Sequence, residues 1–259
     1  MVKGLNTFRE YFKDFPGSYV IIGGTACDII IAAAGLTPRA TKDIDIILII
    51  EALTPDFVRN FWKFIKNGNY EKREKSANER KYYRFLNPAD PDFPFQVELF
   101  SREPDILDLE GEPRFTPIPV DDDLSSLSAI LLNDVYYHFT IDHSIIEDDL
   151  NRANIEALIC LKARAYLETK ARKDKGEKVD TKHIKKHKAD VFRLVLLLAP
   201  ETAFTLPGSI KADLQLFVNT VKNDLPDPAI FKEMGAGIID VTALLNLLVK
   251  NFDLEEATP

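Results

Sequence analysis

The sequence predicts an α+β fold, with a mixed sheet flanked by helices and then a C-terminal helical domain. Two observations lead to this prediction. Up to about residue 150, short runs of β-branched and aromatic residues alternate with segments of helical periodicity. Beyond that point, the apolar residues recur only at helical spacing. We therefore expect a first domain at residues 1–150 and a helical domain at residues 151–259.

The expected elements follow from hydrophobic periodicity and from the positions of turn residues. In the first domain, we expect helices at residues 5–15, 25–34 and 55–66. The expected strands are at residues 18–22, 43–50, 81–86, 95–100, 114–120 and 128–146, the last broken near residues 133–134. In the second domain, we expect helices at residues 154–173, 183–198, 209–221 and 241–251.

The composition excludes several classes of protein. The 259 residues include 46% hydrophobic and 29% charged residues, which excludes a disordered chain, a coiled coil and a collagen-like fibre. No apolar run approaches the roughly 20 residues that a membrane-spanning helix needs, and the charged N-terminus does not resemble a secretory signal. Two cysteines cannot form a disulfide framework or a zinc site. These features favour a cytoplasmic protein without a membrane partner.

Charge is unevenly distributed in this acidic chain, whose formal net charge is −8. Residues 162–193 hold 12 Lys and Arg against 5 Asp and Glu, whereas the rest of the chain is strongly acidic. A basic segment in an acidic protein indicates attraction to an anion such as a triphosphate or RNA. The alternative is a solvated, lysine-rich loop between helices.

Asp43 and Asp45 form the first candidate site. Residues i and i+2 of a strand point to the same face, so both carboxylates project together. The apolar run at residues 46–50 predicts an interior strand, where two unpaired carboxylates would be costly. A divalent metal such as Mg²⁺ would compensate them and keep coordination positions for a substrate phosphate. The alternative is a pair of acids at an exposed strand end.

Two further segments add to this site. Gly23, Gly24 and Thr25 join an expected strand to an expected helix, whose free N–H groups offer a phosphate seat; the alternative is a tight turn without a ligand. Glu98 lies on a later strand and would complete a triad in which two carboxylates hold metal and the third accepts a proton. The alternative for Glu98 is an exposed residue on an edge strand.

The order of these motifs resembles the nucleotidyltransferase superfamily related to polymerase β. The matching residues are Ile22-Gly23-Gly24, then Asp43-Ile44-Asp45, then Glu98 as the third acid. The longer pattern, in which Arg39 and Thr41 precede the two aspartates, looks like the AbiEii-like branch of abortive-infection type IV toxins. Two later helical segments, around Lys162 and Asp190, look like the Lys-bearing helix and the basic-acidic helix of that branch.

The resemblance implies a nucleotidyltransferase-like sheet and a toxin-like enzyme of a toxin–antitoxin pair. Such an enzyme moves a nucleoside monophosphate from an NTP to a hydroxyl of an RNA or protein acceptor, with Mg²⁺ or Mn²⁺ as cofactor and a cognate antitoxin as partner. Asp43, Asp45 and Glu98 would be catalytic metal ligands, and Lys162 a catalytic residue that also binds nucleotide. The other implied nucleotide-binding residues are Gly23, Gly24, Thr25, Arg39, Thr41 and Asp190.

Alternatives remain at each level. Lys162 falls on the inward stripe of its expected helix, where its ammonium either meets an anion or extends outward to solvent. Asp190 and Lys186 are four residues apart and could form an ordinary surface ion pair. The alternative function is a catalytically degenerate protein of the same fold that binds nucleotide or a toxin–antitoxin partner.

Overall fold

The computed structural model describes residues 2–39, 41–71, 82–100, 130 and 133–255. Contacts between Cα atoms divide the chain into two compact units. Unit 1 comprises Met1–Asp28, Ala40–Val120 and His143–Asn154, and unit 2 comprises Ile29–Arg39, Asp121–Asp142 and Ile155–Pro259. The predicted α+β class is confirmed, because unit 1 holds an open mixed sheet and the described part of unit 2 is helical.

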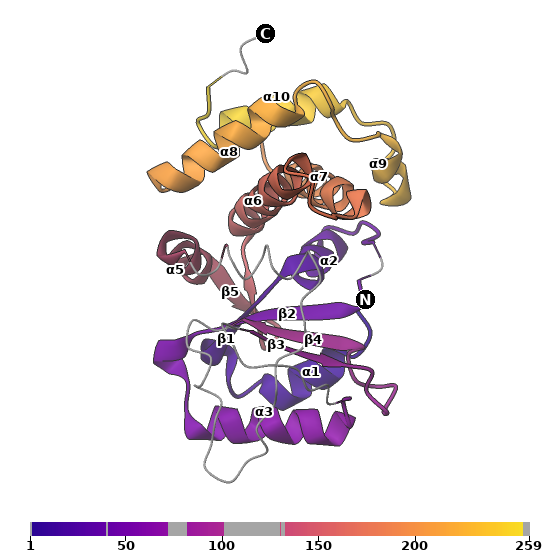
Figure 1. The fold of residues 1–259 in the computed structure, drawn as a ribbon, viewed down its shortest axis with the longest axis vertical. Helices are drawn as coiled ribbons and strands as arrows, with labels where there is room; N and C mark the ends of the chain where they lie inside the picture. Colours follow the sequence, from indigo (N-terminus) through magenta and orange to yellow (C-terminus); the bar gives the residue numbers. More distant parts are fainter. Residues whose placement is uncertain (1, 40, 72–81, 101–129, 131–132, 256–259) are drawn as a thin grey trace. The chain divides into compact units, whose positions relative to one another are not determined.

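Six strands of the described residues form the sheet of unit 1, part of which Figure 1 labels. Their order in the sheet is β3-β4-β2-β1-β6-β5. Their bounds are β1 Tyr19–Ile22, β2 Asp43–Leu48, β3 Tyr82–Leu86, β4 Gln96–Phe100, β5 Ser144–Glu147 and β6 Leu150–Ala153. The pairs β2–β4 and β1–β6 are parallel and the other pairs antiparallel, so the sheet is mixed. Strand β2 lies in the interior between β1 and β4, as its apolar run requires, and its last three residues are all buried.

Two helices, α1 (Leu5–Phe12) and α3 (Pro55–Gly68), lie on one face of the sheet (Figure 1). Helix α3 begins where the Thr54 side chain accepts a hydrogen bond from the Phe57 amide, and ends at Asn69 in the left-handed conformation. Its buried aromatic residues pack edge-on against α1, with the rings of Phe8 and Phe64 5.8 Å apart. This aromatic layer is the core beneath the sheet.

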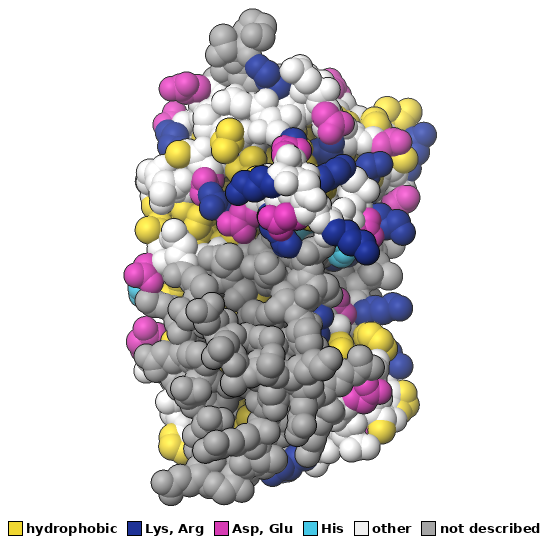
Figure 2. All heavy atoms as spheres, viewed as in Figure 1, with side chains coloured by type: hydrophobic (Ala, Val, Ile, Leu, Met, Phe, Trp, Pro, Cys, Tyr) yellow, Lys and Arg dark blue, Asp and Glu magenta, His cyan; other side chains and the backbone are white. Residues whose placement is uncertain are grey.

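The remaining helices are α2 (Gly23–Ala33), α5 (Asp134–Asp142), α6 (Ile155–Asp174), α7 (Thr181–Val195), α8 (Gly208–Val221), α9 (Ala229–Glu233) and α10 (Val241–Asn251). In unit 2, α6 packs against α7 and α8, and α7 also contacts α9 and α10. Tyr166 of α6 meets Phe217 of α8 edge-on at 5.3 Å in the centre of this bundle. In Figure 2, the part of the molecule that carries α8 and α10 shows basic side chains interspersed with acidic ones.

The prediction of a broken strand at residues 128–146 is wrong for its central part, because residues 134–142 form helix α5. The aromatic and β-branched residues of this segment suggested a strand. The side chain of Asn133, however, accepts hydrogen bonds from the amides of Val135 and Tyr136 at 3.0 and 3.3 Å. This N-terminal cap starts a helix and overrides the weaker strand propensity. Among the described residues of the predicted range, only 144–146, the first three residues of β5, are extended as predicted.

The other described elements have the predicted type, with shifts at their ends. The predicted strand at residues 114–120 lies outside the described residues. Strand β6 and the short helix α9 were not predicted, since neither has a marked periodicity over so few residues. None of the helices in the described ranges is long and apolar enough to cross a membrane.

Candidate functional site

Asp43 and Asp45 open strand β2 and share one of its faces. Both side chains are half-buried, whereas Ile44 between them is fully buried on the opposite face. The alternation of acid and isoleucine therefore places two carboxylates side by side on one face of an interior strand.

Strand β4 brings Glu98 to the same place. In the parallel pairing of β2 with β4, Asp45 lies directly opposite Glu98, and Asp43 lies opposite Gln96. Glu98 is 6% exposed, so it is not the exposed edge residue of the alternative interpretation. Parallel pairing of these two strands thus gathers the three predicted acids.

The environment of Glu98 raises its pKa well above the ordinary value for a glutamate. Burial is the largest cause, followed by the negative charge of Asp45; Arg84 opposes both by favouring the charged form. A hydrogen bond to Asp45 and the charge of Asp43 raise the pKa further. The Glu98 carboxyl therefore lies close enough to Asp45 and Asp43 for their negative charges to disfavour its ionised form.

Arg84 of strand β3 holds the other side of the Glu98 carboxyl. Its two nitrogens Nε and Nη2 lie 2.8 and 2.7 Å from Glu98 Oε1, and Gln96 Nε2 donates to the same oxygen at 2.5 Å. The sequence analysis missed Arg84. A signal was available, because an arginine in the middle of a strand of aromatic and aliphatic residues needs an acidic partner. Finding that partner requires the β3–β4 register, which pairs Arg84 with Glu98.

Replacing Arg84 by methionine is expected to raise the pKa of Glu98 further, because the variant loses the cation that favours the carboxylate. An acid with a raised folded-state pKa destabilises the fold as pH rises from its unfolded pKa of about 4.3 to the folded value. Stability of the variant should therefore keep falling to a higher pH than that of the wild type. Carbon-detected NMR titration of the Glu98 carboxyl measures the shift, and an unchanged pKa would contradict the ion pair.

Gly23 makes room for Asp45 where β1 ends and α2 begins. Its φ is +68°, and a Cβ atom built on it would lie 1.9 Å from Asp45 Oδ2. Only glycine fits such a close approach at this φ. Gly24 is buried in the first turn of α2, and Thr25 Oγ1 donates a hydrogen bond to the Asp43 carbonyl at 2.5 Å. The Gly-Gly-Thr segment thus positions both aspartates: Gly23 leaves room for the Asp45 side chain, and Thr25 holds the Asp43 backbone through its hydrogen bond.

The variant Gly23→Ala is expected to lose roughly 1–3 kcal/mol of unfolding free energy and to displace the Asp45 carboxylate. Both effects follow from the positive φ and the contact with Asp45. Urea denaturation measures the loss. Gly17→Ala is a matched control in unit 1, since a Cβ there would meet nothing within 4 Å. Equal stability of the two variants would contradict the tight fit at Gly23.

The donor set of this acidic site suits a hard divalent cation. The described residues hold no ready-made group of three or more His, Cys, Asp or Glu around one point. Asp45 and Glu98 nevertheless lie opposite each other on neighbouring strands, and the charge of Asp45 raises the pKa of Glu98, so a cation bound between them would relieve this repulsion. The Thr41 Oγ1 atom, two residues before Asp43, is buried without a hydrogen-bond partner among the described residues. The chemistry of these groups therefore fits Mg²⁺ or Mn²⁺.

The other predicted residues meet within unit 2, around Asp190 of α7. Asp190 is 1% exposed and accepts from Arg39 Nε and Nη2 at 3.0 and 3.2 Å. Lys162 Nζ lies 3.2 Å from one of its oxygens and Arg193 Nη1 lies 3.1 Å from the other. The interpretation of Asp190 as half of a surface ion pair with Lys186 is wrong, because the carboxylate is buried among three cations.

These cations decide the ionisation of Asp190. Burial alone would raise its pKa, but the positive charges of Lys162, Arg39 and Arg193 outweigh burial and hold the pKa far below the ordinary value. Asp190 is therefore ionised at neutral pH. One buried carboxylate thus contacts three cations, a group that we call the Asp190 cluster; Glu233 also lies 3.9 Å from Arg193.

The predicted residues thus form two groups, each described within its own unit. The acidic site in unit 1 holds Gly23, Gly24, Thr25, Thr41, Asp43, Asp45 and Glu98, and the Asp190 cluster in unit 2 holds Arg39, Lys162 and Asp190. Comparison of the sequence with protein-family models and with curated proteins finds no match. The interpretation of both groups therefore rests on their chemistry and on the motif resemblance.

Proposed function

We propose that this protein is a metal-dependent nucleotidyltransferase, which moves a nucleoside monophosphate from an NTP to a hydroxyl acceptor and releases pyrophosphate. The observation that carries the proposal is the pairing of Asp45 with Glu98 across two parallel strands, with Asp43 on the same face. The negative charges of Asp45 and Asp43 raise the pKa of Glu98. Carboxylates that perturb one another in this way are typical of sites that bind a cation or transfer a proton.

Each acid has a distinct role in the proposed reaction. Asp43 and Asp45 would hold Mg²⁺ or Mn²⁺, which supplies charge stabilisation for a triphosphate when bound. Glu98 would accept the proton of the attacking hydroxyl, since a raised pKa brings a carboxylate closer to neutral pH, where a general base works best. Arg84 and Gln96 would orient Glu98 through its Oε1 atom.

The Asp190 cluster supports the phosphate-binding part of the proposal. Reactions at a phosphoryl group develop charge mostly on phosphate oxygens, so positive side chains stabilise them. Lys162 and Arg39 are held in fixed positions by a buried carboxylate that both contact. This support comes from unit 2 alone. A toxin-like role, with an RNA or protein acceptor and a cognate antitoxin, follows only from the motif resemblance.

The test is incubation of the protein with each labelled NTP, Mg²⁺ or Mn²⁺, and either total RNA or total protein, followed by detection of label on the acceptor. Label transfer that disappears in Glu98→Gln supports the proposal. Metal-dependent NTP binding without transfer to any acceptor supports the degenerate nucleotide-binding protein instead. The ion pair of Arg84 with Glu98 is the observation that favours this second candidate, because it partly neutralises the third acid.

A further inference from the structure

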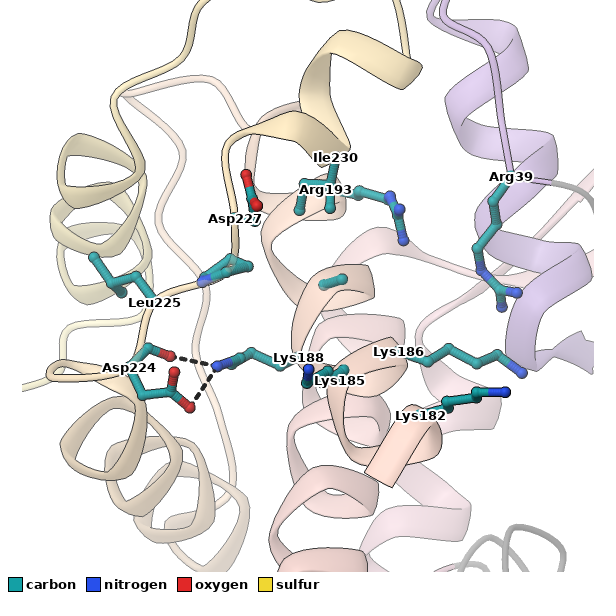
Figure 3. A pocket seen from close by; sticks show the side chains of 12 residues that line it. Arg39, Lys182, Lys185, Lys186, Lys188, Arg193, Asp224, Leu225, Asp227 and Ile230 are labelled. Carbon is teal, nitrogen blue, oxygen red and sulfur yellow. Dashed lines mark hydrogen bonds and ion pairs between the residues drawn. The ribbon is translucent and has the colours of Figure 1, made fainter. Parts of the chain in front are cut away.

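A cavity of about 490 Å³ opens within unit 2 beside helix α7 (Figure 3). It lies between the basic half of α7 and the segment that leads into α9, with Arg39 on a third side. Its lining residues are Arg39, Lys182, Lys185, Lys186, Lys188, Ala189, Arg193, Asp224, Leu225, Pro226, Asp227 and Ile230. Six of these side chains are basic and two are acidic, so the cavity is strongly positive.

Ion pairs with two aspartates hold three of the lining cations in position. Asp190, which does not line the cavity, binds Arg39 and Arg193 from the buried side. Asp224 binds Lys188, whose Nζ lies 2.7 Å from the carboxylate and 2.5 Å from the backbone carbonyl of the same residue. These contacts fix three cations as a rigid frame around the cavity.

Lys182 and Lys185 complete the frame from exposed positions on the first turns of α7. Neither forms an ion pair with any residue in the described part of the chain. In Figure 3, the side chains of Lys182 and Lys186 extend to the same side of the helix as Arg39 and Arg193, whereas Lys188 turns to Asp224. Repulsion among these groups disfavours the empty cavity and is relieved by a bound anion.

We propose that this cavity binds a small ligand with two or more linked phosphate groups, such as inorganic triphosphate or the phosphate chain of a nucleotide. Three of the six cations already contact Asp190 or Asp224, and Lys182 and Lys185 add further donors along α7. A chain of linked phosphates, unlike a single phosphate, is long enough to meet cations at several points of this cavity. Guanidinium and ammonium groups are the side chains that bind phosphate oxygens most strongly. The volume lies within the range of small-molecule sites, about 300–1,000 Å³.

The same phosphate chemistry could come from an RNA backbone, and the shape of the site favours the small ligand. The cations face one cavity from two sides, α7 and Arg39, and the segment that leads into α9 closes a third side. A nucleic-acid backbone is typically followed by an extended groove or stripe of basic residues. Arg39 and Arg193 also belong to the Asp190 cluster, which supports the proposed nucleotidyl transfer, but the four lining lysines take no part in that proposal and no lining residue is a proposed metal ligand.

The test is calorimetric titration of the whole protein with sodium tripolyphosphate in EDTA, which removes divalent metal from the acidic site. We expect binding that weakens as salt increases. Lys182→Gln/Lys185→Gln should lower the affinity about tenfold, because it removes two charged donors from exposed positions. Lys211→Gln/Lys250→Gln is the matched control, since it removes the same charge from exposed lysines outside the cavity and should leave the affinity unchanged.

A second variant is expected to raise the affinity for tripolyphosphate. The Asp227 carboxylate lines the cavity and accepts a hydrogen bond from the Ala229 amide, a contact that asparagine can also make. Asp227→Asn should therefore keep the fold and raise the affinity about threefold, because one repulsive charge is removed.

Three results would overturn the proposal. These are no binding of tripolyphosphate, equal loss of affinity in the two lysine pairs, and binding of an RNA oligonucleotide through Lys182 and Lys185 without any binding of tripolyphosphate. The variant Asp43→Asn/Asp45→Asn should bind tripolyphosphate normally in EDTA, so failure of the nucleotidyltransferase proposal would leave this result intact.

Discussion

Replacing Asp43 and Asp45 together by asparagine is expected to abolish metal-dependent NTP binding and nucleotidyl transfer while the fold remains intact. Both side chains are half-buried on one face of β2, and asparagine has nearly the same shape as aspartate. The variant loses the two charged ligands that Mg²⁺ prefers. We expect transfer to fall at least about 100-fold, which corresponds to roughly 2.7 kcal/mol of transition-state stabilisation.

The same variant should be at least as stable as the wild type in the absence of metal. The charges of Asp45 and Asp43 both raise the pKa of Glu98, so their removal should bring this pKa down towards its ordinary value. The loss of stability that accompanies rising pH should shrink accordingly, since the folded and unfolded states then bind protons more equally around Glu98. Denaturation in EDTA between pH 4 and pH 8 measures this effect.

Asp90→Asn/Asp92→Asn is the matched control for the metal-binding experiment. These two acids also have i,i+2 spacing in unit 1, but they belong to a loop in which Asp90 accepts a hydrogen bond from the Asp92 amide. Their replacement removes the same charge and should leave Mg²⁺·NTP binding unchanged. Equal Mg²⁺·NTP affinity of the wild type and the Asp43/Asp45 variant would refute the metal role.

The acidic site of unit 1 could largely be predicted because its information is local. Two acids at positions i and i+2 before an apolar run predict that both carboxylates lie on one face of an interior strand. Two glycines between a strand and a helix predict that another group packs closely against the backbone there. The structure adds the reason for Gly23, whose missing side chain leaves room for the Asp45 carboxylate. The role of Arg84 could not be read locally, since it depends on the register between two strands joined by a long loop.

The Asp190 cluster shows where sequence periodicity is insufficient. Helical spacing put Lys162 on an inward stripe but could not supply its partner, and it put Asp190 at the edge of an apolar stripe, where an exposed position seemed natural. Arg39 contributes from a segment 151 residues away in the chain. Composition is also insufficient at α5. Its aromatic and β-branched residues favour a strand, but the hydrogen bond from the Val135 amide to the Asn133 side chain caps a helix instead.

The Asp190 cluster should also dominate the stability of unit 2. Asp190→Asn leaves Lys162, Arg39 and Arg193 without a counter-charge, and the side chains of Lys162 and Arg193 are each only 9% exposed. Breaking a buried ion pair by removing one partner typically costs about 3–5 kcal/mol, so we expect a loss of this size in urea denaturation. Asp213→Asn is the control, because its ion pair with Arg164 is more exposed and asparagine can still accept the hydrogen bond from the Tyr136 hydroxyl, so the loss should be smaller.

Acid dependence and a double-mutant cycle separate this effect from simple loss of packing. The folded-state pKa of Asp190 lies below its unfolded value of about 3.9, so its stabilising contribution is complete above that pH and is lost as pH falls towards the folded pKa. The difference in unfolding free energy between wild type and Asp190→Asn should therefore be constant from pH 5 to pH 7 and shrink below about pH 4.

Adding Lys162→Met to Asp190→Asn should restore part of the lost stability, since it removes one of the uncompensated cations. Additive losses in the double variant, or a difference that does not shrink in acid, would show that charge compensation is not what holds Asp190 in the core.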